Sequence, residues 1–287
     1  MAVFEMVKYH AQEYPEDIPL RTEECAAHFD ITSVKADLRY SLHTEYSYGK
    51  RKFNSSLIQN FPELLAAQKM GVPQLWKGNQ WAAEFAQFVC ALAGTQTPEV
   101  IEIHPPFTDY ADMDSFVESY KVFESYIAEQ YPDIKILIEN RCGSVYKGGK
   151  FLISKLPEIE MLCNIIVHKN LCLKMAFDIP QIYTAHNVRK DEQYIDLLGK
   201  SAELVGQIGG VHLWGKRKSD KGRLVAHCGD LTSYFAEDEE LKEAFLREFD
   251  RCFGDGVPRK LVLEVNSGNA DLKSIIDDVR RYGAVFI

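Results

Sequence analysis

The sequence predicts a TIM-type (β/α)8 barrel, and three observations lead to that class. Short runs of β-branched and aliphatic residues alternate with longer stretches of helical periodicity from residue 100 to residue 283. The runs are almost continuously apolar, as expected for parallel strands that helices cover. A polar residue able to bind metal stands at the end of nearly every run, and barrel active sites are built where the strands end. The 287 residues suit one domain, residues 1–287.

The elements after residue 100 follow from this alternation. Five strands are expected, at Val100–His104, Ile134–Glu139, Leu171–Asp178, Ile208–Trp214 and Lys260–Val265. Helices are expected at Met113–Gln130, Pro157–His168, Asp191–Gly206, Asp238–Phe253 and Ala270–Gly283. The last three carry apolar residues at i, i+3, i+4 and i+7, the spacing of one helix face. The glycine clusters at 147–150 and 206–210 fit no nucleotide-binding loop, which argues against an open Rossmann-type sheet.

The N-terminal third is harder to assign. Phe4–Tyr9 and Val34–His43 are candidate strands, and Phe61–Gly94 reads as mostly helical with a break at residues 71–73. Eight strands cannot be counted from these patterns, so the barrel is expected to start irregularly.

Composition predicts a cytoplasmic protein without a membrane segment or an obligate protein partner. No apolar run approaches the roughly 18–20 residues that span a bilayer, and the N-terminus becomes acidic too early for a signal peptide. The seven cysteines include no CxxC pair, which argues against a disulfide framework and a cysteine-rich zinc site. The net charge of −9 argues against non-specific coating of nucleic acid. A basic patch at residues 216–223 is either a solvated loop or a local phosphate contact.

Seven polar residues at strand ends carry the predicted chemistry. Glu139 and Glu264 each follow three consecutive aliphatic residues, and Asp178 follows Met-Ala-Phe. Carboxylates buried at one barrel mouth need a cation to offset their repulsion, and imidazoles are natural co-ligands of such a cation. The sequence therefore predicts a divalent metal site with the ligands His43, His104, Glu139, Asp178, His212 and Glu264, and His227 stands near it at a further strand end.

From about residue 36 to the C-terminus, this order resembles the endonuclease IV family (AP endonuclease family 2) of the xylose isomerase-like superfamily. The motifs are His43-Thr44-Glu45-Tyr46, Ile103-His104-Pro105, Ile138-Glu139-Asn140, the pair His212 and His227, and Leu263-Glu264. The resemblance implies two metal ions. His43, His104 and Glu139 would hold one, and Glu139, as a bridging ligand, would hold the other with Asp178, His212 and Glu264.

Two positions depart from the family's pattern. Gln181 stands where the family has a histidine ligand, and Val225 stands where it has an aspartate. Those two groups and the counterpart of His227 build the family's third zinc site. With His227 alone remaining, the third site is expected to be lost.

The resemblance leaves three functions open. The first is a two-metal phosphoesterase acting on abasic DNA or a small phosphorylated substrate. Glu139, Glu264 and His227 would be catalytic there, and Tyr46, Trp214 and Arg217 would contact the substrate. The second is a metal-dependent sugar or sugar-phosphate isomerase or epimerase. In it Glu139, Asp178, His212 and Glu264 would hold one ion, and the two glutamates would move protons beside a carbonyl. The third is a barrel that keeps its ligands without catalysis. Zinc is the favoured metal, with Mn, Co or Mg as alternatives.

Overall fold

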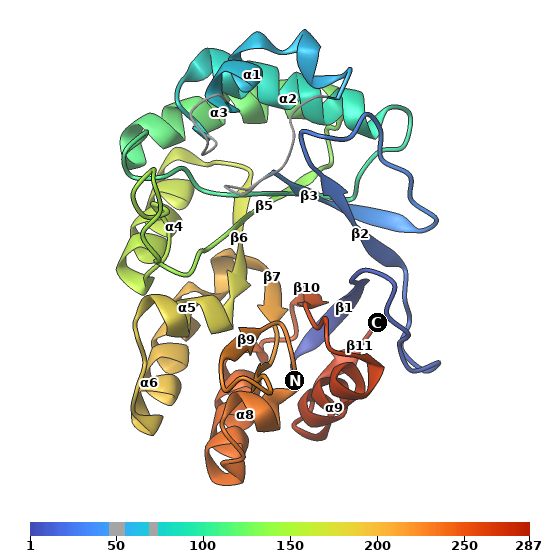
Figure 1. Cartoon of the computed structure of the whole chain (residues 1–287), viewed down its shortest axis with the longest axis vertical. Helices are drawn as coiled ribbons and strands as arrows, with labels where there is room; N and C mark the ends of the chain where they lie inside the picture. The colour runs from blue at the N-terminus through green and yellow to red at the C-terminus, as the bar shows by residue number, and fades with distance from the viewer. Residues whose placement is uncertain (46–54, 69–73) are drawn as a thin grey trace. The chain divides into compact units, whose positions relative to one another are not determined.

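The computed structural model describes residues 1–45, 55–68 and 74–287 (Figure 1). The chain divides into two compact units. Unit 1 comprises residues 1–23 and 176–287, and unit 2 comprises residues 24–175. The division falls inside strands β2 (Thr22–Ala27) and β6 (Leu173–Asp178), so each of these strands contributes residues to both units. That residues 1–287 form a single domain stays a prediction.

Unit 2 contains three consecutive parallel strands, β3 (Arg39–Thr44), β4 (Val100–Ile103) and β5 (Lys135–Glu139). The register places His43 opposite Glu102. Figure 1 shows the first three helices of this unit together beside these strands. The helical elements are η1 (Ile58–Asn60), α1 (Pro62–Gln68), α2 (Asn79–Ala93), α3 (Met113–Gln130) and α4 (Leu156–Lys169).

An aromatic core joins α2 to α3 in unit 2. Trp76 packs edge-on against Phe85, Phe116 and Phe123, with ring centroids 5.4–5.6 Å apart. Trp81 lies against the same cluster, and all five rings are essentially inaccessible to solvent. Rings of this size dominate the apolar area that folding buries, and their edge-to-face contacts add stability. Trp76 and Trp81 are therefore core residues.

Unit 1 is built around β1 (Val3–Lys8) and β10 (Pro258–Leu263), which pair in parallel. Strand β10 also pairs with β7 (Ile208–Leu213), and β1 pairs with the short β11 (Val285–Phe286). The helical elements of this unit are α5 (Ile179–Ala185), α6 (Asp191–Ser201), η2 (Ala202–Gln207), α7 (Leu231–Tyr234), α8 (Glu239–Phe253) and α9 (Asn269–Arg281).

The strand order identifies the fold class. Eight parallel strands follow the order β10-β7-β6-β5-β4-β3-β2-β1, β1 pairs again with β10, and β11 is an extra strand on β1. Helices connect successive strands along most of the chain. This is the TIM-type (β/α)8 barrel that the sequence predicts.

The predicted elements differ from the structure at three places. Strand β2 was not expected, because its sequence Thr-Glu-Glu-Cys-Ala-Ala has one β-branched residue and no apolar alternation. The helix predicted over Asp191–Gly206 becomes α6 followed by the tighter η2. His227, which was expected at the end of a barrel strand, instead follows β9 (Leu224–Ala226), which pairs antiparallel with β8 (Lys216–Lys218) in a hairpin.

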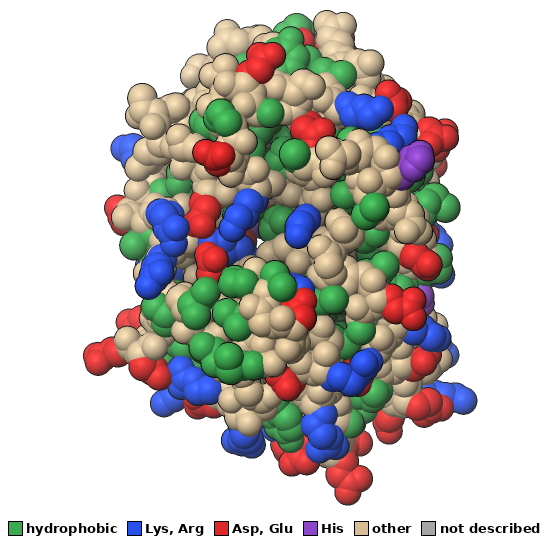
Figure 2. Space-filling model, turned by 180° about the vertical axis from the view of Figure 1, so that it is seen from behind, with side chains coloured by type: hydrophobic (Ala, Val, Ile, Leu, Met, Phe, Trp, Pro, Cys, Tyr) green, Lys and Arg blue, Asp and Glu red, His purple; other side chains and the backbone are tan. Residues whose placement is uncertain are grey.

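The surface and helices give two further observations. Acidic and basic side chains are interspersed over the face shown in Figure 2. None of the helices among the described residues is both long and apolar enough to cross a membrane.

Candidate metal centre

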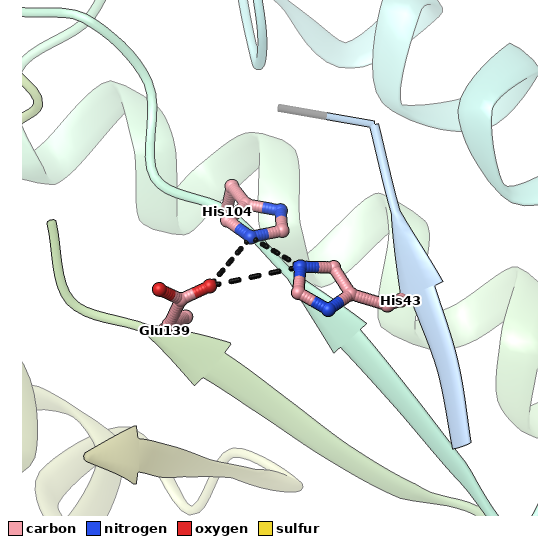
Figure 3. Close-up of side chains that lie close together, drawn as sticks. All are labelled: His43, His104 and Glu139. Carbon is pink, nitrogen blue, oxygen red and sulfur yellow. Dashed lines mark hydrogen bonds and ion pairs between the residues drawn. The ribbon is translucent and has the colours of Figure 1, made fainter. Parts of the chain in front are cut away.

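Two histidines and a glutamate from consecutive strands of unit 2 converge on one point (Figure 3). His43 lies in β3, His104 directly follows β4, and Glu139 is the last residue of β5. The two Nε2 atoms are 3.0 Å apart, and Glu139 Oε2 lies 2.8 Å from His104 Nε2 and 3.7 Å from His43 Nε2. All three side chains are buried. Parallel strands in register place their ends side by side, which explains why residues so far apart in sequence meet.

The donor set fits a divalent cation. Zn–N and Zn–O bonds of about 2.0–2.2 Å in a tetrahedron require ligand atoms roughly 3.3 Å apart. The three observed separations of 2.8, 3.0 and 3.7 Å lie on both sides of that value. Two imidazoles with one carboxylate suit zinc and related metals. Small side-chain rotations would place the three atoms around an ion.

Acidic side chains surround His43. Its Nδ1 lies 3.3 Å from Glu24 Oε2 and 4.0 Å from Glu102 Oε1. Burial alone lowers the pKa of His43, but Glu24, Glu102 and Glu139 together raise it to about 10. This negative field is the environment in which a cation is stabilised.

His104 has the opposite electrostatic setting. Burial lowers its pKa to about 4, despite the opposing effect of Glu139. A neutral imidazole is the form that binds metal. The backbone carbonyl of His104 accepts a hydrogen bond of 2.6 Å from the indole Nε1 of Trp76, so the aromatic core of unit 2 also fixes this strand end.

Glu139 divides its two oxygens between different partners. Oε2 faces the histidines, whereas Oε1 accepts a hydrogen bond of 2.6 Å from Nη1 of Arg141. Arg141 is held by its backbone bond to the carbonyl of Ile153 and by its guanidinium, which lies 5.4 Å from the centre of the Phe151 ring. Half of this carboxylate is thus neutralised by a side chain that cannot lose its charge.

Unit 1 contains a second cluster, formed by Asp178, His212 and Glu264. Each is buried, and one ligand atom from each lies within 4.8 Å of the other two. Asp178 is the last residue of β6, His212 lies in β7, and Glu264 follows β10. His212 Nδ1 and Glu264 Oε1 are 3.0 Å apart. These residues also match the chemistry of a divalent site, with one imidazole and two carboxylates.

His227 approaches the same carboxylate from the hairpin side. Its Nδ1 lies 3.1 Å from Glu264 Oε2, and its ring stacks on Trp214 at 4.3 Å. Burial lowers the pKa of His227, but the hydrogen bond and charge of Glu264 outweigh it and raise the pKa overall. The side chain remains 32% exposed, whereas Glu264 is 8% exposed. His227 can therefore exchange protons with a ligand while Glu264 stays enclosed.

Gln181 takes a defined role at the position where the resembled family has a ligand histidine. Asp178 accepts hydrogen bonds from the Gln181 backbone N–H at 2.9 Å, from its side-chain amide at 2.7 Å and from Trp214 Nε1 at 3.0 Å. The first of these bonds also caps the N-terminus of α5. The amide thus orients the carboxylate instead of supplying a further ligand.

The residues predicted to contact substrate have different surroundings. Tyr46 lies outside the described residues. Trp214 is 5% exposed and is engaged with Asp178. Arg217 is half exposed in β8, and its Nη2 lies 2.7 Å from Asp271 Oδ1.

The sequence analysis did not single out Glu24, Glu102 or Arg141. Glu24 lies in the unpredicted β2, so it had no assigned element. Glu102 offered a signal, because it stands between two isoleucines in a buried strand. Arg141 follows Glu139 by two residues, but the sequence does not indicate that its guanidinium pairs with that carboxylate.

Comparisons with solved structures show a similarity of fold. A xylose isomerase domain protein from Planctomyces limnophilus is similar with a TM-score of 0.50 and 10% identity, over 98% of this chain and 96% of that chain. A D-tagatose 3-epimerase-like protein has a TM-score of 0.48 and 13% identity, over 97% and 96%. An AP endonuclease, family 2, from Brucella melitensis has a TM-score of 0.46 and 15% identity, over 95% and 97%. No family model and no curated protein sequence matches the chain. At 10% identity, the likeness to the Planctomyces limnophilus protein is one of fold alone.

Proposed function

We propose that this chain is a divalent-metal-dependent phosphoesterase, with zinc as the favoured ion. The observation that carries the proposal is the cluster of His43, His104 and Glu139 in unit 2, which exists in addition to the cluster in unit 1. An enzyme that needs one ion has no use for a second buried set of ligands, whereas many phosphoesterases bind two. Buried carboxylates also destabilise a fold unless charge compensates them, so a retained set favours a retained ion.

The two clusters supply the ligands. His43, His104 and Glu139 would hold one ion, and Asp178, His212 and Glu264 would hold another. A bound divalent cation supplies a Lewis acid and lowers the pKa of a water ligand toward neutrality.

The chain's own residues would then position and move protons. Arg141 fixes Glu139 through Oε1 and leaves Oε2 for the metal side. Glu264, between His212 and His227, keeps both imidazoles oriented. His227 is the candidate proton donor to a leaving oxygen, because it is partly exposed and its proton is shared with a buried carboxylate.

The test compares phosphodiester hydrolysis in the wild type and in His104→Ala. We expect the wild type to cleave an abasic-site oligonucleotide or a small phosphodiester, and His104→Ala to lose both one ion per chain and the activity. His168→Ala is the matched control, because His168 is exposed near the end of α4. Metal content and activity that are unchanged in His104→Ala would refute the proposal.

A sugar isomerase or epimerase is the second candidate, and one contact favours it. The bond from Arg141 occupies Glu139 Oε1, so this glutamate has a single oxygen for the histidine side. A glutamate with one available oxygen is a poor bridge between two ions, and this favours a protein with one working ion at the cluster of Asp178, His212 and Glu264. In this case a panel of sugars and sugar phosphates would reveal turnover, and His104→Ala would keep both its metal and its activity.

A further inference from the structure

A cleft of about 540 Å³ opens on unit 1 beside the hairpin of β8 and β9. Three segments form it: the approach to α6 and its first turns, strand β8, and α7 with the turn that follows. Its size lies in the range of pockets for small organic ligands. None of the proposed metal ligands lines this cleft.

Basic side chains dominate the charge of the cleft. Arg189, Lys216, Arg217 and Lys218 line it, against Asp191 and Glu237, which are exposed acidic residues. Arg217 is already paired with Asp271. For Arg189, Lys216 and Lys218, the part of the chain that the structure describes provides no ion pair. Three basic side chains thus line one cleft and form no ion pair among the described residues, although Asp191 and Glu237 also line it.

Lys216 is the most informative of these cations. Its side chain is half-buried, and its Nζ lies 4.1 Å from the centre of the Tyr234 ring. Burial lowers the pKa of Lys216, which reflects the cost of removing an ammonium group from water. The ring face compensates that cost in part. An anionic group in the cleft would compensate it further.

The remaining walls are aromatic. Tyr194, Tyr234 and Phe235 line the cleft and pack against one another, with ring centroids 5.1–6.4 Å apart. Tyr234 and Phe235 are buried, so the partly exposed ring of Tyr194 is the one that can lie against the flat or apolar face of an organic ligand. Cations on one side and rings on the other match a molecule that has an anionic end and an organic body.

We propose that this cleft binds the phosphate group of a small phosphorylated organic molecule, with Lys216 as the principal contact and the aromatic wall holding the organic part. A small molecule fits better than nucleic acid, because a cleft of about 540 Å³ has the volume of one small ligand and the chain carries a net charge of −9. A phosphate site here would name the substrate class of the proposed phosphoesterase. The role of the cleft in turnover rests on that proposed function, whereas binding of a phosphorylated molecule to the cleft is independent of it.

A chain of rings links this cleft to the metal cluster of unit 1. Tyr234 contacts Trp214 at a centroid distance of 6.3 Å, and Trp214 in turn stacks on His227 and donates to Asp178. A phosphate held at Lys216 would thus anchor one end of a substrate close to His227. The cleft is therefore a positioning subsite for a second, reacting part of the same molecule.

The experiment measures binding of ribose 5-phosphate to the full chain with its metal, by calorimetric titration. Ribose and inorganic phosphate are the comparison ligands. We expect ribose 5-phosphate to bind more tightly than either. Lys216→Gln should weaken it by roughly tenfold or more, as for the loss of one charge-assisted contact. Lys221→Gln is the matched control, because Lys221 is an exposed residue of the same hairpin that does not line the cleft.

Several results would overturn the proposal. These are equal weakening by Lys216→Gln and Lys221→Gln, equal binding of ribose and ribose 5-phosphate, and no effect of Lys216→Gln. If a mixed-sequence oligonucleotide bound more tightly than ribose 5-phosphate, and if both variants weakened that binding equally, the basic residues would be assigned to nucleic acid instead. Metal content measured in Lys216→Gln should match the wild type. If ribose 5-phosphate binding depends on Lys216 but no phosphoester is cleaved, the proposed function fails and the binding site stands.

Discussion

At the scale of single residues, Glu139 is the carboxylate whose two oxygens have the most distinct tasks. Oε2 lies 2.8 Å from His104 Nε2, and Oε1 lies 2.6 Å from Arg141 Nη1. Glu139→Gln keeps the shape and an acceptor for Arg141 but removes the anion that a cation needs. We expect one ion fewer per chain and loss of activity with the fold retained. Metal analysis and circular dichroism measure this, and Glu129→Gln at an exposed position of α3 is the control. Unchanged metal content would remove Glu139 from the ligand set.

Arg141 gives a prediction of its own. Its guanidinium places a fixed positive charge beside the carboxylate that would bind the cation. At an effective dielectric constant of about 20, two unit charges about 5 Å apart repel by up to about 3 kcal/mol, and water and ions reduce this. Arg141→Gln should therefore bind zinc about 5–10-fold more tightly, as measured by competition with a chelator. Weaker binding would show that Arg141 acts mainly by orienting Glu139.

The sequence predicts polar residues that meet in the two clusters, but not the groups that support them. His104, Glu139 and Asp178 stand at or beside strand ends, and that position is visible as a polar residue after an apolar run. Gln181 was recognised as a departure, yet its bonds to Asp178 depend on the turn into α5. The side chain of Arg141 pairs with Glu139, two positions before it, and this contact depends on the conformation of the chain after β5, which hydrophobic periodicity does not predict.

At the scale of elements, the buried side chain of Arg259 in β10 forms hydrogen bonds with η2 and with the first residue of β7. Arg259 is 2% exposed, and it donates to the carbonyls of Ile208 and Val205 and to both oxygens of Asp255 at 2.7 Å. The hydrogen bond to Arg259, with its charge, lowers the pKa of Asp255 to about 2. Because the pKa of Asp255 is lower in the folded chain, its ionisation stabilises the fold at pH values above about 3.8, the pKa in the unfolded chain. That contribution is lost as the pH falls toward 2.

Asp255→Asn tests this pair. We expect Asp255→Asn to lower the free energy of unfolding at pH 7 by about 1–2 kcal/mol. This is less than the free energy equivalent to the full pKa shift, because Asp255 is about one third exposed and water screens the pair. The difference from the wild type should shrink as the pH falls from 4 to 2, as followed by urea unfolding. Asp196→Asn, which breaks an exposed pair with Lys200 in α6, should cost less than about 0.5 kcal/mol. An equal effect of both variants would contradict the assignment.

The elements that the sequence placed best are those with strong local signals. Helix α3 spans Met113–Gln130 as predicted, and it begins with a capping box between Asp112 and Ser115. Strand β2 and the hairpin of β8 and β9 lack such signals. Their residues are polar or exposed, so their pairing depends on neighbouring strands and not on their own periodicity.

At the scale of the whole molecule, the ions are expected to contribute to stability as well as to chemistry. The unit 2 cluster brings Glu24, Glu102 and Glu139 close to one histidine, and a cation offsets their repulsion. A ligand at 100 times its dissociation constant stabilises the folded state by about 2.7 kcal/mol per site. Chelation should therefore lower the unfolding temperature, and zinc should restore it. Calorimetry with and without chelator checks this, and an unchanged unfolding temperature would indicate that the clusters hold no ion.

The proposal of two metal ions is tested by the metal content of the chain, purified without added metal or chelator. We expect two ions per chain by elemental analysis, with zinc predominant, one for the cluster of each unit. A single ion, especially manganese or cobalt, would contradict the phosphoesterase and favour the isomerase. No ion, even after reloading, would contradict both and mean that the ligand sets persist without a metal.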